Sequence, residues 1–357
     1  MRVRGRADFA YGNTRLHARR GELLGRADYD RLLRADVDGI LEALATTAYA
    51  AEVEATDRHG GLRRLHEIVS AHMSRSLEEM RSFYTERARP VIDILLSRFD
   101  VHNLLALLRA HARSEHPAEA GSGAVVDVGW LVEPLTGEIL RQSELAGAVD
   151  LIARSTPEPG QARVLRAAFA EYERIEDLAA LERAIVAEHA SRTAATLSTA
   201  GPEAGALLRF AGRAIDERNL VVALRRWEAQ TAGVDLPPTT PIAGGSIPPA
   251  VLQNAMGAAT APALAGRFGE GRWAPPLRRW ASTGDLAGLE RELDRRCIVD
   301  AAALFDRGDP LAIDVPLAFT AATEIEARNL RLLGEASVRG IDPEIVGREL
   351  LRPRARP

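Results

Sequence analysis

The chain has 357 residues and a formal net charge of −4, a balance that gives no overall attraction to nucleic acid or anionic lipid. All 46 of its basic Lys+Arg residues are arginine, which excludes the lysine of a Walker-type phosphate loop or of a Schiff-base enzyme. Hydrophobic residues make up 46% and aromatic residues only 5%, so we expect cores of Leu, Ala, Val and Ile, a composition that suits helices.

The single cysteine and the absence of long apolar runs place further limits on the chain. Cys297 has no partner for an internal disulfide, and its place beside an apolar stripe predicts a packed thiol. The charged amino-terminal segment lacks the apolar centre of a signal peptide, and no run of 18 apolar residues is present. We therefore expect a cytoplasmic protein that reaches a membrane only through partner proteins.

The pattern along the chain predicts helices separated by Pro- and Gly-rich breaks. Short helices are expected over residues 8–54, and longer ones from about 62 to 73 and from Pro90 to about 109. Residues 114–128 and 230–249 are the clearest linkers, with a long helical segment over about 161–197 between them. Residues 255–272 are expected to form a loop, Asp285 to cap the next helix, and residues 341–351 to form the last one. No alternating run predicts a strand, so the expected fold class is all-α.

One block of sequence occurs three times. It reads FDVHNLLALLR at residues 99–109, IDERNLVVALR at 215–225 and, more loosely, IEARNLRLLGE at 325–335. In each copy an apolar residue stands four positions before an asparagine, which places Asn103, Asn219 and Asn329 on the apolar stripe of a helix.

A second pattern shows that these blocks belong to larger repeats. Leu62, Leu178 and Leu286 each begin an i, i+3, i+7 apolar series and precede their asparagines by 41, 41 and 43 residues. Gly129 and Gly245 each follow an asparagine by 26 residues. We therefore predict three similar helical domains of about 110 residues, over 1–116, 117–235 and 236–357.

The asparagines allow a functional and a structural interpretation. A polar side chain that recurs on an apolar face can mark a ligand site, or it can hydrogen-bond a neighbouring segment and fix its register. Three equivalent copies favour the structural role. Arg109 and Arg225, each six residues beyond an asparagine, are expected to pair with acids between units, whereas the third repeat has Glu335 there.

The sequence contains no candidate active site. His66 and His72 are six residues apart on a predicted helix, so they point to different sides and are assigned to an exposed helix surface. The glycines of GRFGEGRW follow no predicted strand and are interpreted as a flexible connection. We therefore predict no catalytic, cofactor-binding or metal-binding residues.

Taken together, these motifs resemble the C subunit of V/A-type rotary ATPases, whose eukaryotic relative is the d subunit of the vacuolar ATPase. The resemblance is carried by the tripled [FI]-[DE]-x-x-N-L block, by Leu181-Glu182 and Leu289-Glu290, and by the segment YGNTRLHARRGELL. It extends over about residues 9–351.

The resemblance implies three similar helical domains around a pseudo-threefold axis, forming a funnel-shaped socket. Such a protein lies on the cytoplasmic face of the membrane, is not an enzyme, and couples the central stalk to the proteolipid ring during ATP-linked proton or sodium transport. Two alternatives remain open: a free-standing helical scaffold that binds proteins outside any rotary complex, and, with less support, an all-α enzyme with a polar pocket between repeats.

Overall fold

The computed structural model describes residues 8–57, 60–113, 125–234, 236 and 239–352. Helices account for all the regular structure in these residues, so the prediction of an all-α fold is confirmed. The helices are α1 (Ala10–Arg19), α2 (Arg26–Leu32), α3 (Val37–Leu44), α4 (Ala50–Ala55), α5 (Leu62–Ser82), α6 (Ala88–Arg113), α8 (Leu135–Leu140), α9 (Leu145–Ser155), α10 (Pro159–Ile175), α11 (Leu178–Thr199), α12 (Gly205–Thr231), α13 (Pro249–Met256), α14 (Ala261–Gly266), α15 (Ala274–Thr283), α16 (Leu286–Ala302), α17 (Leu304–Arg307), α18 (Asp314–Val338) and α19 (Pro343–Glu349), with short 3-10 helices at Arg20–Glu22 and Pro202–Ala204.

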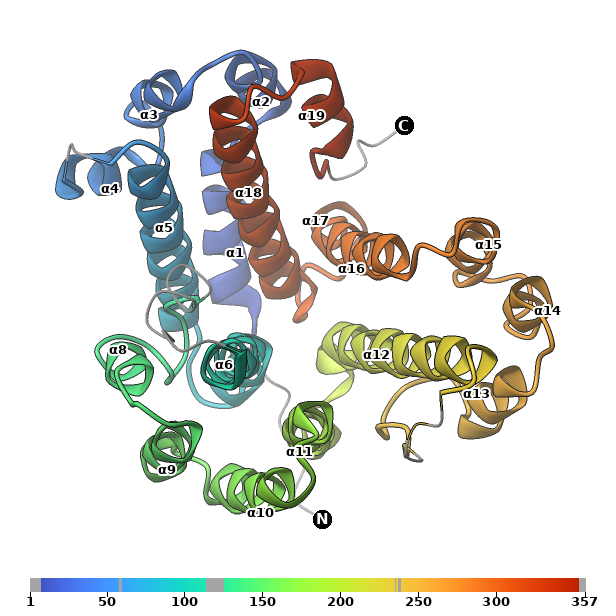
Figure 1. The fold of residues 1–357 in the computed structure, drawn as a ribbon. Helices are drawn as coiled ribbons and strands as arrows, with labels where there is room; N and C mark the ends of the chain where they lie inside the picture. Colours follow the sequence, from blue (N-terminus) through green and yellow to red (C-terminus); the bar gives the residue numbers. More distant parts are fainter. Residues whose placement is uncertain (1–7, 58–59, 114–124, 235, 237–238, 353–357) are drawn as a thin grey trace.

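The three asparagine blocks lie on the three longest helices, α6, α12 and α18, and the three leucine series lie on α5, α11 and α16. Each asparagine helix packs against the leucine helix of the next repeat, so that α6 contacts α11 and α12 contacts α16. The third asparagine helix, α18, packs against α5 of the first repeat. Figure 1 shows the result, in which α1 and α18, from opposite ends of the chain, lie together.

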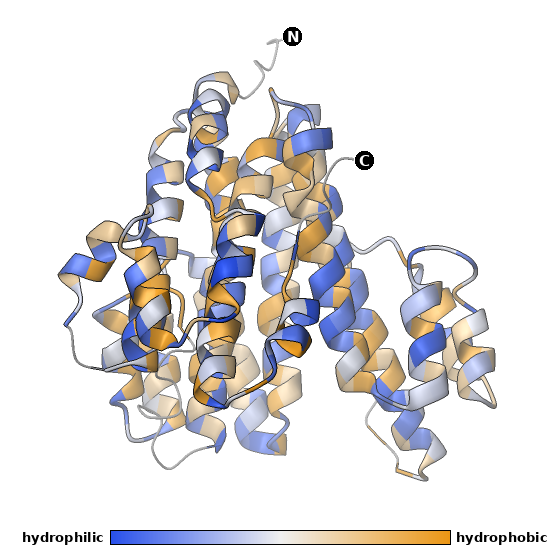
Figure 2. Ribbon diagram, turned by 90° about the horizontal axis from the view of Figure 1, so that it is seen from above, coloured by the Kyte–Doolittle hydropathy of each residue, from blue (hydrophilic) through white to orange (hydrophobic). Residues whose placement is uncertain are grey.

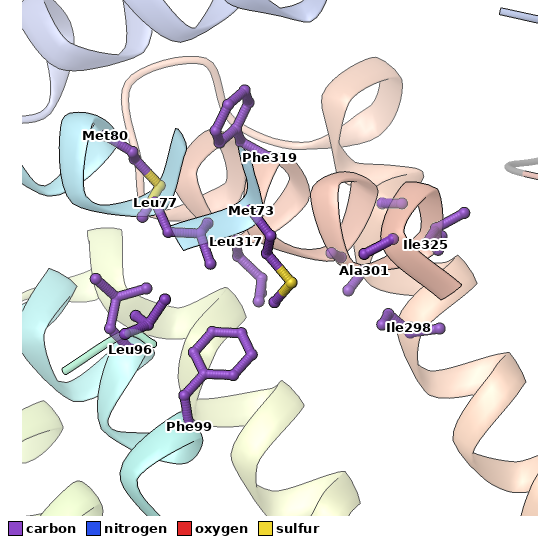
Figure 3. Close-up of a cluster of buried hydrophobic side chains, with 14 of the residues drawn as sticks. Met73, Leu77, Met80, Leu96, Phe99, Ile298, Ala301, Leu317, Phe319 and Ile325 are labelled. Atoms are coloured by element: carbon purple, nitrogen blue, oxygen red, sulfur yellow. The ribbon is translucent and has the colours of Figure 1, made fainter. Parts of the chain in front are cut away.

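The hydrophobic cores lie between the helices that are paired in this way. The largest core combines residues from α1–α6 with residues from α16, α18 and α19. Figure 3 shows part of it, where Met73, Phe99 and Leu317 come from α5, α6 and α18. A second core lies between the later part of α6 and α8–α11, and a third between α12 and α13–α16. The predicted boundaries near residues 116 and 235 fall outside the described residues, so the division into three domains, like their threefold arrangement, stays a prediction.

Local sequence explains where several helices begin. The prediction that Asp285 caps a helix is confirmed, because its carboxylate accepts a hydrogen bond from the Gly288 amide at 2.7 Å. The helical segment expected over 161–197 is divided in two, since Glu176 adopts a left-handed conformation with φ of 53° and Asp177 caps α11. The loop expected over 255–272 contains α14, which buries Leu264 and Ala265 against the third core.

None of the helices in the described ranges has both the length and the apolar composition needed to cross a membrane. Figure 2 shows hydrophobic and hydrophilic residues mixed along the helices, as expected where one side of each packs inward.

Candidate functional site

Each asparagine of the repeated block holds the backbone of a segment that follows its own helix. The side-chain amide donates to a backbone carbonyl and the side-chain oxygen accepts from the amide of the same residue, as in a pair of β-strands. The pairs are Asn103 with Val126 at 2.7 and 2.8 Å, Asn219 with Ile242 at 2.8 and 2.8 Å, and Asn329 with Leu351 at 2.9 and 2.8 Å. All three asparagines are buried. The geometry supports the structural interpretation, in which each asparagine fixes the returning chain against its helix.

Replacing Asn219 with leucine is expected to lower the free energy of unfolding by about 1–3 kcal/mol, because the amide and carbonyl of Ile242 would be buried without partners. Chemical denaturation of the purified chain measures this change. Gln230→Leu is the matched control, since Gln230 is an exposed amide on the same helix. Equal stabilities for the two variants would argue against this role for Asn219.

An acidic residue three positions before each asparagine makes a second contact that the sequence analysis did not identify. Asp100 accepts hydrogen bonds from the Trp130 and Leu131 amides at 2.9 and 3.1 Å. Asp216 accepts from the Ser246 and Ile247 amides at 2.9 and 2.8 Å and from the Ser246 hydroxyl at 2.6 Å. The acid that recurs in the [FI]-[DE]-x-x-N-L block is the feature of the sequence from which these backbone contacts could have been predicted.

The same contact explains the glycines that follow the first two asparagines by 26 residues. A Cβ atom on Gly129 would lie 2.2 Å from Asp100 Oδ1, and one on Gly245 would lie 2.2 Å from Asp216 Oδ1. Gly129 also has φ of +97°, which L side chains rarely adopt. Glycine is therefore needed where the backbone approaches each carboxylate.

In the third repeat the acid is Glu326, and the backbone that it holds comes from the amino-terminal segment. Its carboxylate accepts hydrogen bonds from the Leu24 amide at 2.5 Å and from the Tyr49 hydroxyl at 2.8 Å. Burial raises the pKa of Glu326 to about 7, although both hydrogen bonds favour the charged form. The longer glutamate side chain thus links α18, near the carboxyl terminus, to the amino-terminal segment by hydrogen bonds.

The raised pKa of Glu326 predicts a pH-dependent stability. The unfolded chain loses this proton near the ordinary pKa of 4.5, whereas the folded chain keeps it to about pH 7, so stability falls as the pH rises between these values. Glu326→Gln cannot lose a proton and is expected to be more stable than the parent at pH 8 by about 3 kcal/mol, with the two converging near pH 4. Thermal unfolding at several pH values measures this, and a constant difference between the two proteins would contradict it.

The arginines that follow two of the asparagines form ion pairs between repeats. Arg109 pairs with Glu182 at 2.6 Å, from α6 to α11, and Arg225 pairs with Glu290, from α12 to α16. At the equivalent position of the third repeat there is no such arginine–carboxylate pair: Glu335 on α18 lies 3.9 Å from His66 on α5, and burial lowers the pKa of that histidine. The change from arginine to Glu335 therefore accompanies a change in its partner.

A cavity of about 480 Å³ lies between the repeats. Its walls come from α5, α6, α11, α12, α16 and α18, that is, from the asparagine and leucine helices of all three repeats. Met73, Phe99 and Ile298 give it an apolar part that is continuous with the largest core. Five arginines and three acidic residues also line it: Arg98, Arg109, Arg218, Arg328, Arg331, Glu217, Asp294 and Glu324. We call this the central cavity.

His72 and Cys297 are both buried, and only the cysteine was predicted to be so. His72 is buried, stacked on Tyr49 with 3.7 Å between ring centroids and 3.3 Å from Glu52, so its assignment to an exposed surface was wrong. The physical reason is α4, which covers this side of α5 and brings Glu52 over it. Cys297 is buried, as predicted, and burial raises the pKa of its thiol to about 12. Within the described ranges no three His, Cys, Asp or Glu residues are grouped as metal ligands.

Comparison with known proteins gives a consistent result. The family model for the ATP synthase (C/AC39) subunit matches residues 12–349. The chain is 28% identical to the C subunit of the V-type ATP synthase of Thermus thermophilus, over 97% of this chain and 99% of the relative. It is 26% identical to the C subunit of the A-type ATP synthase of Haloferax volcanii, over 98% and 99% of the two chains. The corresponding protein of Thermococcus onnurineus is 24% identical over 94% and 88%.

Proposed function

Because the family model spans residues 12–349, the chain belongs to the ATP synthase (C/AC39) subunit family, and we propose that it is a non-catalytic central-rotor subunit of a V/A-type ATPase. In this role it is a socket that receives the foot of the central stalk and couples its rotation to the membrane proteolipid ring. ATP chemistry and proton or sodium transport then take place in other subunits.

The central cavity is the observation that carries this proposal. It lies where helices of all three repeats meet, so a stalk foot seated there would touch each repeat at once. The buried asparagine contacts hold three of the six cavity-lining helices, α6, α12 and α18, to segments that follow them in the chain, which favours a stiff wall. Stiffness is what a part that transmits torque requires.

The partners in this proposal are the central-stalk subunits and the proteolipid ring, and the place is the cytoplasmic face of the membrane. Contact with the membrane would be made through partner subunits.

Affinity purification of the tagged full chain from gently solubilised membranes of its own host tests the proposal. Mass spectrometry is expected to find central-stalk subunits and the proteolipid among the recovered proteins. Recovery from the soluble fraction with unrelated partners would instead support the free-standing scaffold.

A variant that fills the central cavity makes the test specific to this site. Ala214 is exposed and lines the cavity, so Ala214→Trp is expected to reduce recovery of the stalk subunits. Ala170→Trp is the matched control, because Ala170 is exposed on α10, away from the cavity. Equal recovery with both variants would mean that the stalk binds elsewhere.

A further inference from the structure

The central cavity has a basic residue at the same position in each repeat. His102, Arg218 and Arg328 directly precede the three asparagines, and all three line the cavity. Arg331 lies three residues beyond Arg328, on the same side of α18, and also lines it. The asparagine therefore points into the protein while its neighbour faces the cavity.

Some of the cavity's arginines are neutralised by carboxylates of the chain itself. Arg328 pairs with Glu324 at 2.7 Å and with Asp294. Arg98 also pairs with Glu324. The third acidic residue of the lining, Glu217, pairs with Arg213 at 3.1 Å. Each of the three acids that line the cavity is therefore already engaged by an arginine.

Two arginines of the lining have no carboxylate partner among the described residues. Arg331 donates a hydrogen bond to the neutral Ser70 hydroxyl at 2.8 Å. Arg218 makes no hydrogen bond or ion pair within the described part of the chain, and the nearby Glu182 and Glu290 are taken by Arg109 and Arg225. Both side chains are only partly exposed, and this burial lowers the pKa of each.

Partial removal of a cation from water without a partner costs free energy. A carboxylate supplied by a ligand would offset this cost with an ion pair. The chain as a whole is acidic, at −4, yet the cavity lining has five arginines against three acids. His189, also in the lining, adds no charge near neutral pH because burial lowers its pKa to about 4. The arginines of the lining carry guanidinium groups, which bind carboxylates in a fixed geometry.

We propose that the protein seated in the central cavity presents carboxylate side chains to Arg218 and Arg331, which makes its foot acidic. This inference rests on the proposed function, since the occupant is the central-stalk subunit. The paired arginines, Arg98 and Arg328, hold the helices of the wall to one another, and the two unpaired ones are left for the partner.

The test measures the affinity of the full chain for purified central-stalk subunits of the same organism's V/A-type ATPase, over a series of NaCl concentrations. Arg218→Gln and Arg331→Gln are each expected to weaken binding by about thirty-fold or more at low salt, and to make the affinity less dependent on salt. Arg278→Gln is the control, because it changes the net charge equally at an exposed site outside the cavity.

The outcomes separate this inference from the function on which it rests. Failure of the parent chain to bind the stalk would overturn both. Binding by the parent with unchanged affinity in the two cavity variants would overturn the inference alone. Thermal unfolding shows whether the variants fold, and Arg218→Lys and Arg331→Lys, which keep the charge, are expected to bind more tightly than the glutamine variants. Equal weakening by Lys and Gln would also count against a carboxylate partner, since it would make shape the cause.

Discussion

Replacing Gly334 with leucine is expected to lower the free energy of unfolding by about 1–3 kcal/mol. A Cβ atom at Gly334 would lie 2.5 Å from Leu65 Cδ2 and 2.8 Å from Leu62 Cδ1, so a side chain fits between α18 and α5 only if these two leucines shift. A leucine would displace these side chains and disturb the packing of the largest core, to which both helices belong. Chemical denaturation measures the loss.

The control for this substitution is Gly266→Leu, since Gly266 ends α14 and a Cβ atom there would have nothing within 4 Å of it. It is expected to change stability by less than about 0.5 kcal/mol. If the two leucine variants unfold at the same denaturant concentration, α5 and α18 are packed less closely at Gly334 than the 2.5 and 2.8 Å distances imply.

Asp216→Ala is expected to cost about 3–5 kcal/mol, because it removes the acceptor of three hydrogen bonds at once. Two of the donors are backbone amides, which have no other way to be satisfied without moving the chain around Gly245. Asp216→Asn keeps one acceptor oxygen and should lose less. Thermal and chemical unfolding of both variants provide the measurement.

Asp150→Ala serves as the matched control, because Asp150 forms an ion pair with Arg154 on an exposed face of α9. Such pairs contribute little, so the expected change is within about 0.5 kcal/mol. An effect of Asp216→Ala no larger than that of the control would mean that the loop around Gly245 is held by its other contacts.

The repeats were predictable because they depend on residue spacing. The similar distances from the leucine series to the asparagines, 41, 41 and 43 residues, come from equivalent helices, and the structure places those residues on α5, α6, α11, α12, α16 and α18. The sequence indicates that each buried asparagine needs a hydrogen-bond partner. It does not indicate which residue that partner is. Their partners lie 22 or 23 residues away in segments that have no regular structure.

The pairing of the repeats could not be predicted from periodicity. An apolar stripe shows that a helix is covered but not by which other helix, so the packing of each asparagine helix against the next repeat was not anticipated. The loosened third block shows the same limit. Gly334 and Glu335 replace the leucine and arginine of the other copies, and the reason is the partner helix α5, with Leu65 and His66 facing them.

The exposed position assigned to His72 was wrong for a related reason. His72 continues the buried series of Leu65, Ile68 and Val69 at i+7, i+4 and i+3, so it lies on the covered side of α5, but the local sequence does not show that α4 brings a polar partner to it. Burial of a polar residue depends on partners brought from elsewhere, here Glu52 and Tyr49.

The contact of α18 with α5 and α1 also bears on the order in which the protein can fold during synthesis. Asn13 donates hydrogen bonds to the carbonyls of Pro310 and Ala312, almost 300 positions later in the chain, and the largest core needs residues from both ends. Amino-terminal segments leave the ribosome first, yet this core cannot form until the carboxyl-terminal residues have been synthesised. The cores within α6–α11 and α12–α16 have no such delay. The middle of the chain can therefore be folded while its beginning still exposes apolar helices, and the closing step brings the two ends together.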